Sequence, residues 1–162
     1  MIGTQAISAS EALEAFSSAN PTAGAIVSFT GKVREDKSDK DVTQTLHLEA
    51  YEPLTSQKIE DKRQESLKRW DLEDATVLHR IGDIPVGETI VFVATAAKHR
   101  RDAFEAADFL MDYLKTEAFF WKKDIGTHHS QWIEPRSQDY EDAARWRASS
   151  DKFKATNQGP KT

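Results

Sequence analysis

The sequence predicts one α+β domain built on a largely antiparallel or mixed sheet. Its 162 residues are the length of an ordinary single domain. After a first helix, the expected order is β-β-α-β-β-α-β-β, which lacks the strict strand–helix alternation of doubly wound folds. We expect the domain to span residues 1–146. The segment 147–162 is polar and aperiodic, which predicts a disordered tail.

The expected helices and strands follow from local patterns. In chain order they are a helix over 8–18, strands over 24–34 and 42–52, a helix over 54–69, strands over 75–82 and 88–97, a helix over 101–117, and short strands near 120–124 and 129–134. Ser8 and Glu11 have capping-box spacing, which marks the start of the first helix. Pro53 suits the start of the second helix. The first two strands are separated by a charged segment, and this order suggests a hairpin with a long mobile tip.

The strand over 88–97 and the helix after it carry the clearest signals of burial. The run Ile90–Ala94 is apolar on both faces, so we place it in the middle of the sheet. The following helix has a buried stripe at 3.6-residue spacing. The stripe consists of Ala103, Ala107, Leu110, Met111, Leu114 and Ala118.

Composition excludes several classes of function. There is no cysteine, so disulfides and thiolate chemistry are ruled out, and the five histidines show no metal-ligand spacing. No signal peptide, no membrane-spanning run and no phosphate-binding glycine motif is present, so we expect a cytoplasmic protein with neither metal nor cofactor. The net charge of −5 argues against general nucleic-acid binding. Two basic islands, KHRR at 98–101 and KK at 122–123, instead favour a small anionic ligand.

Three candidate groups lie near those islands. His99 and Arg100 stand between a strand and a helix N-terminus, where an anion is favoured, although a solvated turn is an equally good interpretation. Lys115 follows Leu114 at the border of the buried stripe, so it is either a reactive, partly desolvated amine or an ordinary lysine covering apolar surface. If residues 120–122 form a strand, Phe120 and Lys122 share one face, giving a pocket with an aromatic floor and a basic rim.

Several blocks carry a resemblance to a known family. They are FTGKVR (29–34), LEAYE (48–52), HRIGDIPVGE (79–88), IVFVATAAKHRRDAFEA (90–106), MDYLKTEAFFWK (111–122) and WIE (132–134). In this combination and order, the sequence resembles the large, catalytic subunit of molybdopterin synthase, the sulfur-inserting enzyme of molybdenum cofactor biosynthesis.

The resemblance implies a fold, an assembly and a reaction. The fold would be of the α/β hammerhead type, and the chain would form a homodimer that becomes a heterotetramer with two small ubiquitin-like sulfur-carrier subunits. The carrier's C-terminal Gly-Gly tail would bring a thiocarboxylate. This sulfurtransferase would use it to convert cyclic pyranopterin monophosphate into the dithiolene of molybdopterin.

The resemblance also implies site residues. Lys115 and Lys122 match the catalytic lysines, without a division of roles between them. The remaining matches are substrate-binding Lys32, Arg34, His99, Arg100 and Arg136, of which Arg136 reaches into the neighbouring protomer's site, and carrier-tail residues Phe29 and Met111. This chain departs from the family at Phe119, where proline is common, and at Asp124, where glutamate is common.

Two other classes of function compete with this interpretation. A non-catalytic binding module for a ubiquitin-like tail or a small anionic metabolite would share the pocket and its cations without needing a reactive lysine. A Schiff-base lyase would use Lys115 as its nucleophile.

Overall fold

The computed structural model describes residues 1–35, 37–38, 41–118 and 120–156. In chain order the elements are β1 (Ile2–Gly3), α1 (Ala9–Ala19), β2 (Ala25–Lys32), β3 (Lys37–Ser38), β4 (Asp41–Ala50), α2 (Leu54–Arg69), β5 (Asp74–Arg80), β6 (Gly82–Pro85), β7 (Thr89–Ala97), α3 (Arg100–Thr116), β8 (Phe120–Gly126), β9 (Ser130–Ile133) and α4 (Ser137–Thr156). The predicted α+β class is confirmed. Within the described ranges, no helix is both long and apolar enough to cross a bilayer.

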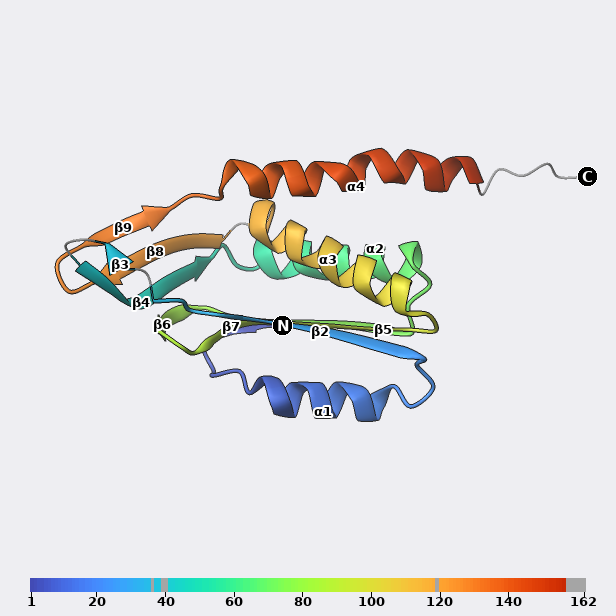
Figure 1. Ribbon diagram of the computed structural model, residues 1–162, viewed down its shortest axis with the longest axis horizontal. Coiled ribbons are helices and arrows are strands. Elements are labelled where there is room, and N and C mark those ends of the chain that lie inside the picture. Colours follow the sequence, from blue (N-terminus) through green and yellow to red (C-terminus); the bar gives the residue numbers. More distant parts are fainter. Residues whose placement is uncertain (36, 39–40, 119, 157–162) are drawn as a thin grey trace, which may run out of the picture.

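A four-stranded sheet in the order β1-β5-β7-β2 forms the centre of the molecule. Strand β7 is antiparallel to both neighbours, whereas β1 runs parallel to β5. Helix α1 covers one face of this sheet, and α2 and α3 cover the other (Figure 1). Because helices cover both faces, β7 is buried on both sides, as its apolar run predicts.

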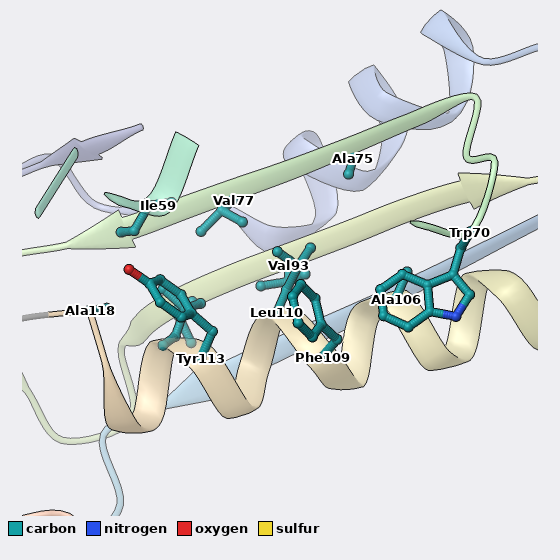
Figure 2. Close-up of a cluster of buried hydrophobic side chains, with 12 residues drawn as sticks. Ile59, Trp70, Ala75, Val77, Val93, Ala106, Phe109, Leu110, Tyr113 and Ala118 are labelled. Atoms are coloured by element: carbon teal, nitrogen blue, oxygen red, sulfur yellow. The ribbon is translucent and has the colours of Figure 1, made fainter. Parts of the chain in front are cut away.

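The main core lies between this sheet and helices α2 and α3. Val93 of β7 meets Phe109 and Leu110 of α3 there, and Ile59 of α2 closes one side (Figure 2). Complete burial of a Leu or Phe side chain contributes about 1.5–3 kcal/mol to folding, so this row fixes α3 firmly against the sheet. The predicted stripe of α3 is buried except for Met111, which is half-buried at the cavity described below.

A second sheet, of five strands, extends from one end of the first. Its order is β3-β4-β8-β9, with β6 also paired to β4. Val33, Leu48 and Ile84 form a small core at the junction of the two sheets. The expected hairpin of the first two long strands is therefore wrong. Strand β2 pairs along its length with β7, while β4 pairs with β8 and β6 in the other sheet. Alternating residues predict a strand but not its partner.

Helix α4 is the longest element that the sequence analysis missed, besides the short strands β1, β3 and β6. It runs to Thr156, so residues 147–156 are helical where a disordered tail was expected, and the helix crosses the expected boundary at 146; residues 157–162 lie outside the described part. The helix is held through Trp146, whose ring meets those of Trp70 and Phe109 edge-on. The Trp146 Nε1–H also donates to Asp112 over 2.7 Å. These anchors are tertiary contacts, which the helix's own weak periodicity does not reveal.

Candidate active site

A cavity of about 560 Å³ opens where the two sheets meet the C-terminal end of α3. It gathers every predicted site residue except His99 and Arg100. The predicted residues that line it are Phe29, Lys32, Arg34, Met111, Lys115, Lys122 and Arg136. They come from β2 and the segment after it, from the last two turns of α3, from β8 and from the segment before α4, so the cavity exists only in the folded chain.

Lys115 stands at the border predicted for it. It is exposed, in the last turn of α3, directly after the buried Leu114. A second hollow of about 640 Å³ lies on the α2 side of the same helix end. Both Lys115 and Lys122 line both hollows. The lysine pair is therefore accessible from two directions.

Strand β8 presents Lys122 by simple alternation. Lys122 lines both hollows and Phe120 lines the second one, whereas Trp121 is 63% exposed on the other face of the strand. On that outer face the ring of Trp121 meets that of Trp132, and the Lys123 ammonium lies 5.4 Å from the Trp132 ring centroid. The predicted assignment of alternate β8 side chains to two opposite faces is confirmed. Phe119 lies outside the described residues.

The electrostatic environment disfavours the charge on Lys122. Burial lowers the pKa of Lys122 below its ordinary value, and the nearby charge of Lys115 lowers that pKa further. Asp139, in the first turn of α4, acts in the opposite direction. An amine with a lowered pKa exchanges protons more readily near neutral pH, which is what a proton-transfer group requires.

His79 is a cavity residue that the sequence analysis left unassigned. It continues the buried row of Ala75 and Val77 on β5, on the face covered by α2 and α3. Its ring stacks on Phe120 with 3.9 Å between centroids and 17° between planes. Burial lowers the pKa of His79 to about 4, and the charge of Lys122 contributes to the lowering. The signal in the sequence was the alternation of ATVLHR, which assigns His79 to the buried face.

Asp124 also lines the cavity, and only one of its two carboxylate oxygens is hydrogen-bonded to other described residues. Its Oδ2 accepts hydrogen bonds from Thr43 Oγ1 and His129 Nε2, both over 3.0 Å. Its Oδ1 is buried without a partner among the described residues. Across all the residues that the structure describes, no three His, Cys, Asp or Glu side chains lie close enough together to hold a metal ion.

His99 and Arg100 do not line the cavity of their own chain. They are exposed at the N-terminal end of α3, whereas Lys115 lies at its C-terminal end. Fifteen residues at 1.5 Å each separate Arg100 from Lys115 by roughly 22 Å along the helix. The His99 side chain makes no capping hydrogen bond.

Comparison with known proteins places this arrangement in a family. The model of the MoaE protein family matches residues 2–117. The chain belongs to the MoaE family. The molybdopterin synthase catalytic subunit of Caulobacter vibrioides is 46% identical over 134 residues, which cover 83% of this chain and 87% of the relative. The resemblance predicted from the sequence is thereby confirmed.

Solved MoaE-type structures share the fold. A molybdopterin biosynthesis MoaE protein from Burkholderia ambifaria is 38% identical, with a TM-score of 0.72, over 90% of this chain and 95% of that one. A Helicobacter pylori structure, described as a complex of subunits 1 and 2 of molybdopterin-converting factor, is 25% identical, with a TM-score of 0.71, over 84% and 90%. The MoaE family match stops at residue 117, so Lys115 falls inside it, whereas Lys122 and Arg136 fall beyond it.

The buried His79 predicts a specific acid sensitivity. Below pH 6.5 the unfolded chain takes up a proton on His79 that the folded chain refuses until about pH 4. Stability therefore falls as the pH falls through this window, by about 3 kcal/mol in total at 1.36 kcal/mol per pKa unit. Urea unfolding at pH 7 and pH 4.5 measures this loss. His79→Phe keeps a ring on Phe120 but does not titrate. Between pH 7 and pH 4.5 this variant should therefore lose less stability than the wild type, and the difference should be most of the ~3 kcal/mol. Equal losses in the two proteins would show that His79 does not resist protonation.

Proposed function

We propose that this chain is the catalytic subunit of a molybdopterin synthase. It transfers sulfur from the thiocarboxylated Gly-Gly tail of a small ubiquitin-like carrier to cyclic pyranopterin monophosphate, and the product carries the dithiolene of molybdopterin. The observation that carries the proposal is the pair Lys115 and Lys122, which lines one cavity with Lys32, Arg34 and Arg136 in a chain of the MoaE family.

The basic rim of the cavity supports an anionic substrate. Lys32, Arg34 and Arg136 provide charge for a phosphate, and a guanidinium can grip two phosphate oxygens at once. The cations are partly balanced by Asp124, Glu134 and Asp139 in the same lining. In a protein of net charge −5, such a local basic site favours a compact anion over a long polyanion.

The two hollows support a reaction between two large substrates. In our proposal the carrier tail passes Phe29 and Met111, and its sulfur reaches the lysines. The thiocarboxylate sulfur attacks a carbon of the cyclic phosphate ring and forms a C–S bond while the bond from that carbon to the phosphate oxygen breaks, so the phosphate stays on the pterin as an open monoester. Water then cleaves the acyl–sulfur bond, so the carrier leaves as a carboxylate and sulfur stays on the pterin. Lys115 and Lys122 move the protons or stabilise the developing negative charge. The Helicobacter pylori complex of two subunits supports a small-subunit partner.

A homodimer would explain the remote His99 and Arg100. Within one chain they are too far from Lys115 to contact the same phosphate, so a role in substrate binding requires a second copy of the chain. Arg136 lines its own chain's cavity, but it is exposed at the edge and follows the exposed Trp132 and Ile133 of β9, so we infer that in a dimer its side chain turns to the neighbouring protomer's site. Such apolar side chains at the end of a sheet favour an interface. We infer that each site is completed by residues of the neighbouring protomer.

Replacing Lys115 by alanine should nearly abolish sulfur transfer. Loss of a group that moves protons or stabilises developing charge typically reduces the rate by roughly 10²–10⁴-fold. The side chain is exposed, so the variant should fold normally. The assay is a single turnover of thiocarboxylated carrier with cyclic pyranopterin monophosphate, following dithiolene formation. Lys123→Ala, on the outer face of β8, is the matched control and should keep the wild-type rate. A Lys115→Ala rate within a few-fold of wild type would favour a binding module instead.

Two inactive variants should rescue each other if the site is shared. In a mixed dimer of Lys115→Ala and Arg136→Ala chains, both defects can fall in one site and leave the other intact. With equal amounts and random exchange, activity should return to at most about a quarter of wild type, because about half of the dimers are mixed and each has one good site of two. Exchange is forced by mild denaturation and refolding, and verified by mass spectrometry of the dimers. Absence of recovery in verified mixed dimers would rule out a site shared through Arg136.

A further inference from the structure

We propose that His79 is a substrate-recognition residue of the cavity, whose Nε2 lone pair accepts a hydrogen bond from an N–H or O–H group of the pterin. This inference rests on the proposed function and deepens it, because it separates recognition of the pterin from recognition of its phosphate. The cations of the cavity hold the anion, and a neutral imidazole holds a donor group.

The first support is the position of the ring. On β5 the buried side chains are Ala75, Val77 and His79, so the row changes from hydrocarbon to imidazole at the residue that meets the cavity. Phe120 holds one face of the ring by stacking, and only 6% of the residue is exposed. A ring fixed in this way presents its edge in one orientation, which suits selective hydrogen bonding.

The second support is the tautomer. The Nδ1 atom lies 3.0 Å from the carbonyl oxygen of Arg80, and a carbonyl can only accept, so Nδ1 carries the hydrogen and donates. In the neutral ring, Nε2 then has a lone pair. Among the described residues Nε2 has no hydrogen-bond partner, and it is not one of the buried, unpartnered polar atoms. The lone pair is therefore available to a ligand in the cavity.

The third support is the charge around the ring. Burial and the neighbouring Lys122 keep His79 neutral, so it remains an acceptor at physiological pH. A phosphate dianion and a thiocarboxylate offer acceptors but no donors, so neither can use this lone pair. The ring N–H and amino groups of a pterin, and the hydroxyl groups of its side chain, do offer donors. His79 thus distinguishes the pterin from any other small phosphate that the basic rim attracts.

Three substitutions separate Nε2 from the rest of the ring. His79→Asn places an amide N–H near the Arg80 carbonyl but leaves nothing at the position of Nε2. His79→Phe retains a ring on Phe120 and removes both nitrogens. His79→Gln carries an amide oxygen far enough to replace the Nε2 acceptor. A requirement for Nε2 alone predicts that the first two variants fail in the same way and that the third recovers part of the function.

The experiment is calorimetric titration of wild type and the three variants with two probes, cyclic pyranopterin monophosphate and inorganic phosphate. We expect the Asn and Phe variants to bind the pterin phosphate about tenfold or more weakly, as for a lost hydrogen bond to a buried acceptor, and inorganic phosphate within about twofold of wild type. Their KM for the pterin phosphate should rise in a steady-state assay of dithiolene formation with little change in kcat, because the contact exists in ground and transition states alike. The Gln variant should recover several-fold of the lost affinity.

Two outcomes would overturn the inference while leaving the proposed function intact. One is wild-type affinity of the Asn and Phe variants for the pterin phosphate. The other is an equal loss of affinity for both probes, which would assign His79 a structural role in the cavity wall. If the wild-type protein neither binds nor converts the pterin phosphate, the proposed function fails, and this inference fails with it.

Discussion

The mutual approach of Lys115 and Lys122 is the constraint on which the rest of the structure depends. Two like charges repel, and burial adds to the cost of charging Lys122. The chain nevertheless brings them to one place from different elements, the end of α3 and the start of β8. The scaffold must therefore hold both backbones against that repulsion. Two lysines held close together in this way can stabilise negative charge that develops on a substrate, or transfer a proton, which is why we place the chemistry there.

The four-stranded sheet supplies the required rigidity. Strand β7 is buried on both faces, and α3 is anchored on the sheet through buried side chains such as Leu110 and Phe109. Lys115 lies in the last turn of α3, one residue before the helix ends at Thr116, so almost the whole length of the helix supports it. The second sheet then supplies Lys122 through β8, and the small core around Leu48 and Ile84 fixes the angle between the two sheets. Hydrophobic packing in the first sheet thus stabilises an electrostatically unfavourable site beside it.

Local patterns in the sequence predicted the elements well and their partners poorly. Helix α2 has the predicted bounds, and the alternation of β8 placed Phe120 and Lys122 on the face that lines the second hollow because strand geometry allows no other arrangement. The hairpin was wrong because alternation does not name a partner strand. Helix α4 was missed because Trp146 stabilises it from outside. His79 was overlooked because a histidine on a buried face looks like an ordinary core residue until its neighbours are known. His99 and Arg100 lie at the far end of α3 from Lys115, so their predicted role in substrate binding rests on the proposed dimer, which no local pattern encodes.

The pKa of Lys122 tests this account most directly. It can be measured by NMR titration of the lysine side chains, assigned with Lys122→Arg. The account predicts a pKa below the ordinary lysine value of 10.5. Lys115→Gln, which removes the like charge, should raise that pKa but not restore it fully, since burial is the larger cause. Asp139→Asn, which removes the opposing carboxylate, should lower it further. A Lys122 that titrates as a free lysine, unchanged by either substitution, would contradict the central claim that two lysines share one partly desolvated site.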